Sequence, residues 1–233
     1  MERRQFVTAC AAVAAGGLSA ATRAWAEATP HFYPRARLVD IHGDPLKVQQ
    51  LAARTNYVFC YPFAATPCFL LDLGAPVAAA AALLRADGTT YTWSGGVGPR
   101  RSVVSFSAIC AHKLAYPTRE LSFIRFQPGR SATSDGNVIH CCADHSVYDP
   151  AAGARVVSGP APQPLAAILL DYDAERDELV ALGTAGAEQF DAFFRKYEFR
   201  LTLDYGAGKA QRSVGATTLV RELKEYCRQT IQC

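Results

Sequence analysis

The chain has 233 residues, of which 50% are hydrophobic and 19% charged, a composition typical of a folded globular protein rather than a disordered or fibrous one. Its formal net charge is +3, and three arginines against one glutamate in residues 1–26 account for +2 of it, so the remainder carries only about +1. A near-neutral body without basic runs gives no indication of nucleic-acid binding, and we expect none.

Residues 1–26 have the pattern of an export signal. A short basic start precedes an Ala/Gly-rich, weakly apolar stretch, and Ala24 and Ala26 form the A-x-A pattern of a signal peptidase site. The pair Arg3-Arg4 resembles a twin-arginine signal, which predicts a periplasmic protein; a plain secretory signal is the alternative. The apolar stretch is shorter than the roughly 20 residues that a spanning helix needs. We therefore expect membrane contact only if the signal stays uncleaved.

Between Arg37 and about Gly183, short β-rich runs alternate with turn residues. This spacing predicts a mainly β fold, an antiparallel sandwich or barrel. "DPLKVQQLAAR" could form a short helix, and "PVAAAAALLRADG" could be a helix or an alanine-rich strand. The expected strands are RLVDI, NYVFCYPF, CFLLDLG, TYTW, SVVSFSAI, LSFIRF, NVIHC, AAILLDYD and ELVALG.

The pattern changes after Gly183, where apolar residues recur at helical spacing in "AEQFDAFFRKYEF" and "TTLVRELKEYCRQTI". Residues 186–233 are therefore predicted to form a mostly α-helical C-terminal extension, with "RLTLDYG" as one strand. The stripe that includes Phe190, Phe193 and Phe194 is expected to dock on the parent domain rather than bind a cofactor.

Two short motifs combine soft and borderline metal ligands. Cys110 and His112 form a C-x-H pair, and Cys142 and His145 form a C-x-x-H pair. Each pair follows a β-like run, as expected of two neighbouring loops at one end of a sheet. Two thiolates and two imidazoles suit a zinc ion or a 2Fe-2S cluster in which the cysteines hold one iron and the histidines the other. Zinc fingers usually pair Cys with Cys and His with His, so the mixed pairs favour the cluster.

At these residues the sequence resembles the Rieske iron-sulfur family, which combines the same two motifs. Tyr148-Asp149-Pro150 follows the second motif, and "SGPAPQPLAAILLDYD" is similar to the proline loop that covers the cluster in that family. The resemblance implies a Rieske-type domain over residues 33–185, with a cluster-binding subdomain at about 105–163. It also implies one 2Fe-2S cluster per chain, with Cys110, His112, Cys142 and His145 as the metal ligands.

The chain departs from the family in the segment between the motifs and in two cysteine positions. Residues 113–141 separate His112 from Cys142, a longer spacing than usual, so "TRELSFIRFQPGRSATSDG" is expected to form an extra hairpin. Quinol-oxidising members carry a disulfide whose positions correspond here to Ala115 and Asp144. That bridge is therefore expected to be absent.

The resemblance also indicates residues around the cluster. Ser146 and Tyr148 are the candidates for donating hydrogen bonds to the sulfurs of the cluster. Pro160 is a candidate for the surface on which a partner docks. The segment from His145 to Tyr148 is one residue shorter than the family pattern, which leaves the serine bond open.

The other cysteines are candidates for disulfides in an oxidising compartment. Cys60–Cys68 and Cys227–Cys233 are possible bridges, with Cys141 buried and free, although the sequence does not fix the pairing. His140 is interpreted as a strand-end residue.

No catalytic residues are predicted, because the chain has no H-E-x-x-H, G-x-S-x-G or P-loop motif. A Rieske oxygenase would need a second iron site with two histidines and a carboxylate, and too few histidines remain. We expect an electron-transfer subunit rather than the catalytic chain of an oxidoreductase.

Within the family the sequence is most similar to the small subunit of periplasmic arsenite oxidase, over residues 37–185, on its leader and on "YPFAATPCFLLDLG", "GGVGP" and "LDYDAERDELVALG". This implies a larger, molybdenum-containing partner and a c-type cytochrome or cupredoxin as soluble carrier. The alternatives are a Rieske subunit of a quinol–cytochrome c reductase and a structural zinc Cys2His2 interaction module.

Overall fold

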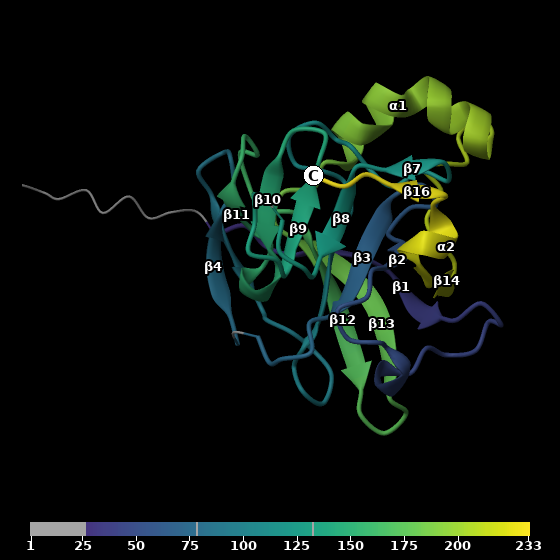
Figure 1. Ribbon diagram of the computed structural model, residues 1–233. Helices are drawn as coiled ribbons and strands as arrows, with labels where there is room; N and C mark the ends of the chain where they lie inside the picture. Colours follow the sequence, from purple (N-terminus) through teal and green to yellow (C-terminus); the bar gives the residue numbers. More distant parts are fainter. Residues whose placement is uncertain (1–26, 78, 132) are drawn as a thin grey trace, which may run out of the picture.

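A large curled β-sheet forms the body of the protein in the computed structural model, which describes residues 27–77, 79–131 and 133–233 (Figure 1). The expected export signal lies outside these residues. The sheet has eight strands in the order β14-β1-β13-β12-β6-β3-β2-β15. Their bounds are β1 (His31–Val39), β2 (Tyr57–Cys60), β3 (Pro67–Asp72), β6 (Val103–Ser107), β12 (Ala167–Asp173), β13 (Glu178–Ala185), β14 (Thr217–Leu219) and β15 (Arg221–Glu222).

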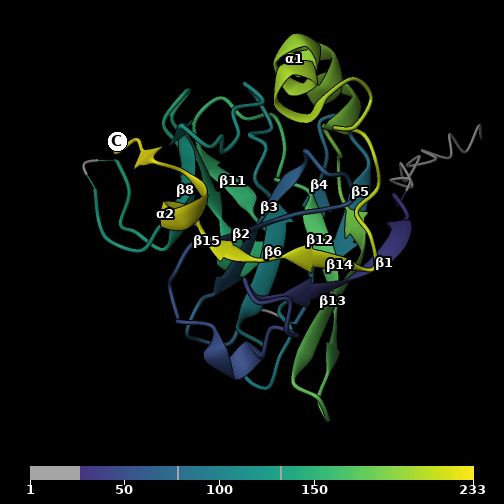
Figure 2. The ribbon, with the colours of Figure 1, turned by 90° about the vertical axis from the view of Figure 1, so that its right-hand side faces the viewer.

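The sheet is nearly closed by its own C-terminal segment. Strands β14 and β15 are separated only by Val220, yet they pair with β1 and β2 at opposite ends of the strand order. The two edges of the sheet must therefore lie close together, and the yellow segment bridges them in Figure 2. The Val220 amide donates to the Val39 carbonyl at 2.8 Å, and the Thr218 hydroxyl donates to the Cys60 carbonyl at 2.7 Å. The outer edges of β1 and β2 are therefore covered by β14 and β15. An uncovered edge strand would favour pairing with another chain and aggregation.

Strand β3 separates two hydrophobic cores. All of its residues are buried, and successive side chains point to opposite faces. Phe69 and Leu71 therefore pack in one core, while Cys68 and Leu70 pack in the other. This explains why the strand reads as a continuous apolar run rather than an alternating one.

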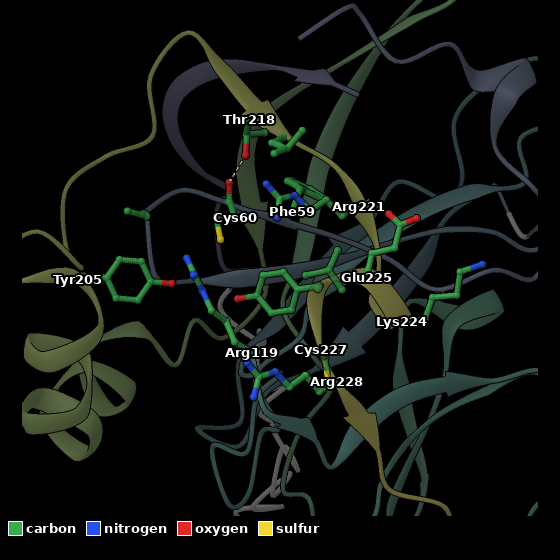
Figure 3. A pocket seen from close by; sticks show the side chains of 14 residues that line it. Phe59, Cys60, Arg119, Tyr205, Thr218, Arg221, Lys224, Glu225, Cys227 and Arg228 are labelled. Atoms are coloured by element: carbon green, nitrogen blue, oxygen red, sulfur yellow. Dashed lines mark hydrogen bonds between the residues drawn. The ribbon is translucent and has the colours of Figure 1, made fainter. Parts of the chain in front are cut away.

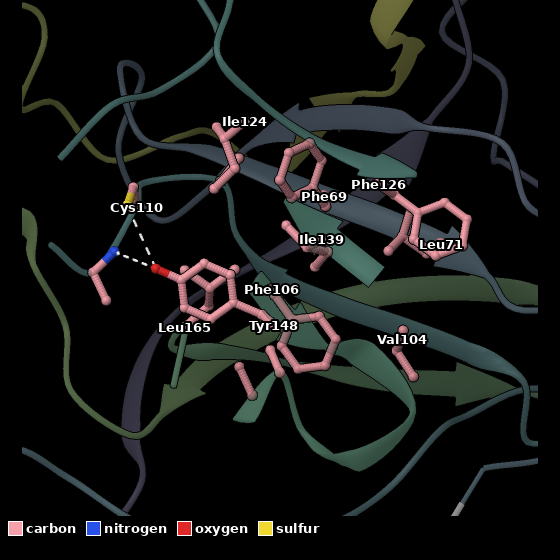
Figure 4. Packing of buried hydrophobic residues seen from close by; sticks show 14 of the residues in the cluster. Phe69, Leu71, Val104, Phe106, Cys110, Ile124, Phe126, Ile139, Tyr148 and Leu165 are labelled. Carbon is pink, nitrogen blue, oxygen red and sulfur yellow. Dashed lines mark hydrogen bonds between the residues drawn. The ribbon is translucent and has the colours of Figure 1, made fainter. Parts of the chain in front are cut away.

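A smaller sheet packs on one face of the large sheet. Ile124, Ile139 and Tyr148 of the small sheet lie in one core with Phe69 and Phe106 of the large one (Figure 4). The hairpin expected in the long insert is present, since β8 and β9 pair antiparallel. The small sheet has the order β11-β10-β9-β8, with β8 (Ile124–Gln127), β9 (Val138–Cys141), β10 (Ser146–Asp149) and β11 (Arg155–Ser158).

The remaining elements are short. The alanine-rich run contains a strand, β4, rather than a helix, and the helix expected early in the chain is one 3-10 turn. The mainly β prediction is confirmed. The bounds are η1 (Val48–Gln50), β4 (Ala81–Leu84), β5 (Thr90–Trp93), β7 (Leu121–Ser122), η2 (Pro150–Ala152) and β16 (Gln229–Thr230), with β4 paired to β5 and β7 to β16.

The C-terminal extension contains two helices, α1 (Phe190–Tyr205) and α2 (Leu223–Tyr226). Helix α1 packs its phenylalanine stripe against the body, as expected, in a cluster that includes Ile109. The prediction of a strand at "RLTLDYG" is wrong, because residues 200–205 continue α1. Leu201 is buried as the next apolar residue of the stripe, whereas Leu203 is exposed. The second expected helix is helical only in α2, and the sequence around it forms β14, β15 and β16.

No helix within the described ranges is long and apolar enough to cross a membrane.

Candidate metal centre

Two loops meet where the large and small sheets pack together. Loop 1, residues 108–117, follows β6 of the large sheet, and loop 2, residues 142–145, is the turn between β9 and β10 of the small sheet. Loop 1 supplies Cys110, and β9 ends at Cys141 immediately before loop 2. Both cysteines are fully buried. The sheet packing therefore brings two thiols from distant parts of the sequence to one point.

A carboxylate and an imidazole join these thiols. The ligand atoms of Cys110, Cys141 and Asp144 all lie within 4.8 Å of one another. Asp144 Oδ2 is 3.3 Å from Cys110 Sγ and 2.9 Å from His112 Nδ1. The Asp144 side chain is only 2% exposed, whereas that of His112 is 35% exposed. We call Cys110, His112, Cys141 and Asp144 the donor cluster.

The surroundings of the two thiols favour a thiolate at Cys110. The pKa of Cys110 is lowered to about 7, first by a hydrogen bond from Cys141 and, against the effect of burial, by bonds from the Tyr148 hydroxyl and the amides of His112 and Lys113. The pKa of Cys141 is raised by its bond to Cys110 and by burial. Cys110 is therefore the more acidic of the two thiols, and the thiolate is the form that binds metals.

The carboxylate is also held in its charged form. Burial raises the pKa of Asp144, but hydrogen bonds from the Ser146 amide and from the thiols of Cys110 and Cys141 outweigh it and hold the pKa below its usual value. The Ser146 amide lies 2.9 Å from Asp144 Oδ1. This bond fixes the carboxylate inside the turn between β9 and β10.

Tyr148 connects the small sheet to loop 1. Its hydroxyl is 3.4 Å from Cys110 Sγ and accepts a hydrogen bond from the Ala111 amide at 3.2 Å (Figure 4). The side chain is fully buried in the core. The hydroxyl can therefore donate to the Cys110 sulfur and stabilise negative charge on it.

A third loop, residues 159–163, packs against the start of β10. The Ser146 hydroxyl accepts a hydrogen bond from the Ala161 amide at 3.1 Å. Gly159 has a φ of +87°, and a Cβ there would lie 2.5 Å from the His145 carbonyl oxygen, so only glycine allows this approach. Pro160 is exposed at the tip of this loop. The third loop thus packs against His145 and Ser146, the two residues that follow Asp144.

Two of the four predicted ligands lie elsewhere. Cys142 forms a disulfide with Cys233, with a Cα–Cα distance of 5.6 Å, so it has no thiolate to offer and the predicted ligand role disagrees with the structure. His145 is exposed and has a left-handed φ of 59°. Cys110 and His112 are therefore joined by Cys141 and Asp144, and not by Cys142 and His145.

His145 belongs to a second group of potential ligands, with His140 and Cys233. The rings of His140 and His145 are 6.1 Å apart. Burial lowers the pKa of His140, and both of its ring nitrogens lack a hydrogen-bond partner among the described residues. Because the Cys233 sulfur is in the disulfide, this group has no free thiol and is a weaker metal site than the donor cluster.

Both predicted disulfides are wrong, since Cys60, Cys68 and Cys227 are free. In the β2–β3 register Cys68 lies opposite Phe59, so Cys60 and Cys68 are offset by one residue and point to opposite faces. Cys227 donates to the Gln229 carbonyl at 2.7 Å, and Cys233 is paired with Cys142. Cys141 is buried and not in a disulfide, as expected.

Cys141 and Asp144 are donors that the two sequence motifs do not predict, although one signal in the sequence points to them. The segment from His145 to Tyr148 is one residue too short for the family pattern. Counted back from Tyr148, which contacts Cys110, the position of the second histidine falls on Asp144 and that of the second cysteine on Cys141.

One cavity has no residue of the donor cluster in its lining. It has a volume of about 480 Å³ and is lined by Cys60, Arg119, Tyr205 and Arg221, among others (Figure 3). Burial raises the pKa of Cys60 to about 11, which keeps this thiol protonated at neutral pH. The lining also includes the free thiol of Cys227, whose pKa is likewise raised by burial. With two protonated thiols and no histidine in its lining, the cavity is a weaker candidate for a metal than the donor cluster.

No family model matches the chain. Among solved structures, the chain is similar to the soluble domain of the Rieske protein II (soxF) from Sulfolobus acidocaldarius. The two are 27% identical with a TM-score of 0.45, over 65% of this chain and 78% of that chain. At this TM-score a functional assignment depends on the residues of the donor cluster themselves.

Proposed function

We propose that the protein binds one 2Fe-2S cluster of Rieske type between loops 1 and 2 and carries single electrons. One observation carries this proposal: the buried thiols of Cys110 and Cys141 meet His112 and Asp144 where two sheets pack, with the Tyr148 hydroxyl beside the Cys110 sulfur. The C-x-H motif and the proline-rich third loop support it from the sequence.

The donor atoms and their surroundings fit such a cluster. Cys110 and Cys141 would hold one iron on the buried side, since both thiols are inaccessible to solvent. His112 would be a ligand of the other iron, nearer the surface. Iron accepts thiolate, imidazole and carboxylate ligands in proteins, and hydrogen bonds from Tyr148 and backbone amides stabilise the sulfur charge.

A bound cluster of this type supplies reversible one-electron chemistry at a higher potential than clusters ligated by cysteine alone. The protein keeps the cysteine side dry and leaves the His112 edge partly exposed. Electrons would enter and leave through His112. The next residue, Lys113, is exposed, and so is Pro160 in the third loop. A partner would dock on this surface.

By its sequence resemblance, the protein would be the electron-transfer subunit of a larger oxidoreductase. The proposed partner is an arsenite-oxidase-like, molybdenum-containing chain, and the proposed carrier is a c-type cytochrome or a cupredoxin. The leader in residues 1–26 and the Cys142–Cys233 disulfide support a periplasmic location, because disulfides persist in oxidising compartments.

A structural zinc site is the second candidate. The compactness of the donor cluster favours it, since three ligand atoms within 4.8 Å of one another can surround a single ion. Thiolate, imidazole and carboxylate are all common zinc ligands. In that case the two loops would be joined by a metal without redox chemistry.

Metal analysis of the purified, exported protein tests the proposal. We expect about two irons and two acid-labile sulfides per chain, with a paramagnetic signal on reduction. Cys110→Ser should lose most of the iron, whereas the control Cys60→Ser, in the cavity that has no residue of the donor cluster in its lining, should retain it. Stoichiometric zinc with no iron after anaerobic reconstitution would contradict electron transfer.

A further inference from the structure

We propose that Asp144, and not a second histidine, completes the site, so that one iron is held by Cys110 and Cys141 and the other by His112 and Asp144. This inference rests on the proposed function, since it assigns the ligands of the same cluster. It differs from the two-cysteine, two-histidine set that the C-x-H and C-x-x-H motifs imply. In each case the proposed ligand is the residue just before the one that the motif implies: Cys141 in place of Cys142, and Asp144 in place of His145.

The choice between the cysteines follows from the strand geometry. Side chains alternate across β9, which ends at Cys141, and Cys142 is the first residue of the turn that follows. Cys141, the last residue of the strand, is fully buried with its ligand atom near those of Cys110 and Asp144. Cys142 lies on the other side, where its sulfur is bonded to Cys233. Only Cys141 can present a thiolate beside Cys110.

The C-terminal segment holds Cys233 in this position independently of the disulfide. Strand β16 pairs with β7, and Arg125 donates to the Ile231 carbonyl at 3.2 Å and to the Gln232 side chain at 2.6 Å. These contacts place the end of the chain against loop 2. Cys233 is therefore held where it pairs with Cys142, and the disulfide keeps the Cys142 sulfur from acting as a ligand.

The choice between Asp144 and His145 follows from burial and charge. The Asp144 side chain is 2% exposed, and among the described residues its only ion-pair partner is His112. A buried carboxylate is costly unless it is paired or coordinates a metal. His145 has a left-handed backbone and is exposed, with its ring beside His140 instead of the thiols. The buried charge therefore faces the thiols, and the exposed imidazole does not.

The spacing to the neighbouring residues agrees with this assignment. With His145 as ligand, the segment to Tyr148 is one residue short; with Asp144 as ligand, the spacing of the family is restored. Tyr148 reaches Cys110, and Ser146 reaches the third loop, from the positions expected of the two residues that follow the ligand. His145 then occupies the intervening position, where the backbone is left-handed.

A carboxylate ligand changes the charge of the site. An imidazole ligand is neutral, whereas Asp144 adds one negative charge next to the iron. Since net charge and ligand type set the potentials of iron-sulfur clusters, we expect a lower potential than in a site with two imidazoles. Asp144→His should raise it.

Pulsed electron paramagnetic resonance on the reduced holoprotein tests the outer ligands by counting coordinated histidine nitrogens. We expect one strongly coupled nitrogen in the wild type and in His145→Ala, and two in Asp144→His, together with a higher potential. Two nitrogens in the wild type, one of them lost in His145→Ala, would overturn the inference. So would an Asp144→His protein with one nitrogen and an unchanged potential.

A matched cysteine pair tests the inner ligands. Cys141→Ser should lose most of the iron, as Cys110→Ser does, whereas Cys142→Ser should keep the wild-type iron content and spectrum and lose only the disulfide. The reverse pattern contradicts the inference. If Asp144→His fails to fold, the nitrogen count of the wild type still decides. Absence of iron from every protein, including the wild type, would instead refute the proposed function.

Discussion

Asp144 and His145 show how a single backbone angle separates neighbouring side chains. The Asp144 carboxylate accepts a hydrogen bond from the Ser146 amide and points inward. The backbone of His145 has a left-handed φ of 59°, and its side chain points outward. Asp and His both tolerate such turns better than most residues. The turn therefore decides which of two adjacent polar groups is buried with the thiols.

Tyr148→Phe should destabilise the metal-free protein. The substitution leaves the buried Ala111 amide without its acceptor and removes a donor from Cys110, and a buried unsatisfied group costs about 1–3 kcal/mol. Urea unfolding measures the loss. As a control, Tyr172→Phe removes only a partly exposed bond to Asp177 and should cost less than about 0.5 kcal/mol. Equal losses would contradict a special role for the Tyr148 hydroxyl.

The sequence predicts the chemical type of the ligands better than it identifies the individual ligand residues. Adjacent cysteines at 141 and 142 let the C-x-x motif begin at either position, and only the strand alternation of β9 selects Cys141. The disulfide is not readable either, because Cys142 and Cys233 are 91 positions apart and meet through the pairing of β16 with β7.

At the scale of elements, the strands of the body are predictable because they are apolar runs between turns. Residues 200–205 are not, since Leu201 and Leu203 alternate as in a strand while only Leu201 packs. The tertiary contacts of α1 therefore decide between the strand periodicity and the helix periodicity of this segment. The short strands β14 and β15 have no sequence signal of their own, because they are strands only through their pairing with the edges of β1 and β2.

Helix α1 should contribute strongly to stability through Phe193. This side chain is fully buried among the aromatic residues beneath the helix, and Phe→Ala in a core costs about 3–5 kcal/mol. Phe199 lies on the same helix but is 79% exposed, so Phe199→Ala should be nearly neutral. Thermal unfolding of the two variants gives the comparison, and similar melting temperatures would show that α1 is only loosely attached.

Removal of residues 217–233 should prevent folding. The deletion takes β14 and β15 from the edges of β1 and β2, and it exposes two unpaired edges that favour aggregation. Size-exclusion chromatography after expression measures the outcome. A monomeric, folded truncation product would contradict the structural role of this segment.

The whole molecule is cross-linked by the Cys142–Cys233 bond across a sequence separation of 91. In the chain-entropy model, a loop of this size stabilises the folded state by roughly 4.6 kcal/mol. Cys233→Ser should lower the melting temperature under oxidising conditions, and the difference from the wild type should disappear once a reductant is added. A difference that persists in reductant would mean that Cys233 acts through packing alone.

The pairing of β1 with β14 and of β2 with β15 has a kinetic consequence. These contacts join residues more than 160 positions apart, such as Arg37 with Thr217 and Val58 with Arg221, and folding slows as contacts become more distant in sequence. Most of the chain must be synthesised before the sheet can close. Until β14 and β15 are made, the outer edges of β1 and β2 remain unpaired. Export by the proposed twin-arginine route, which carries folded proteins, would leave time for the sheet to close before transport.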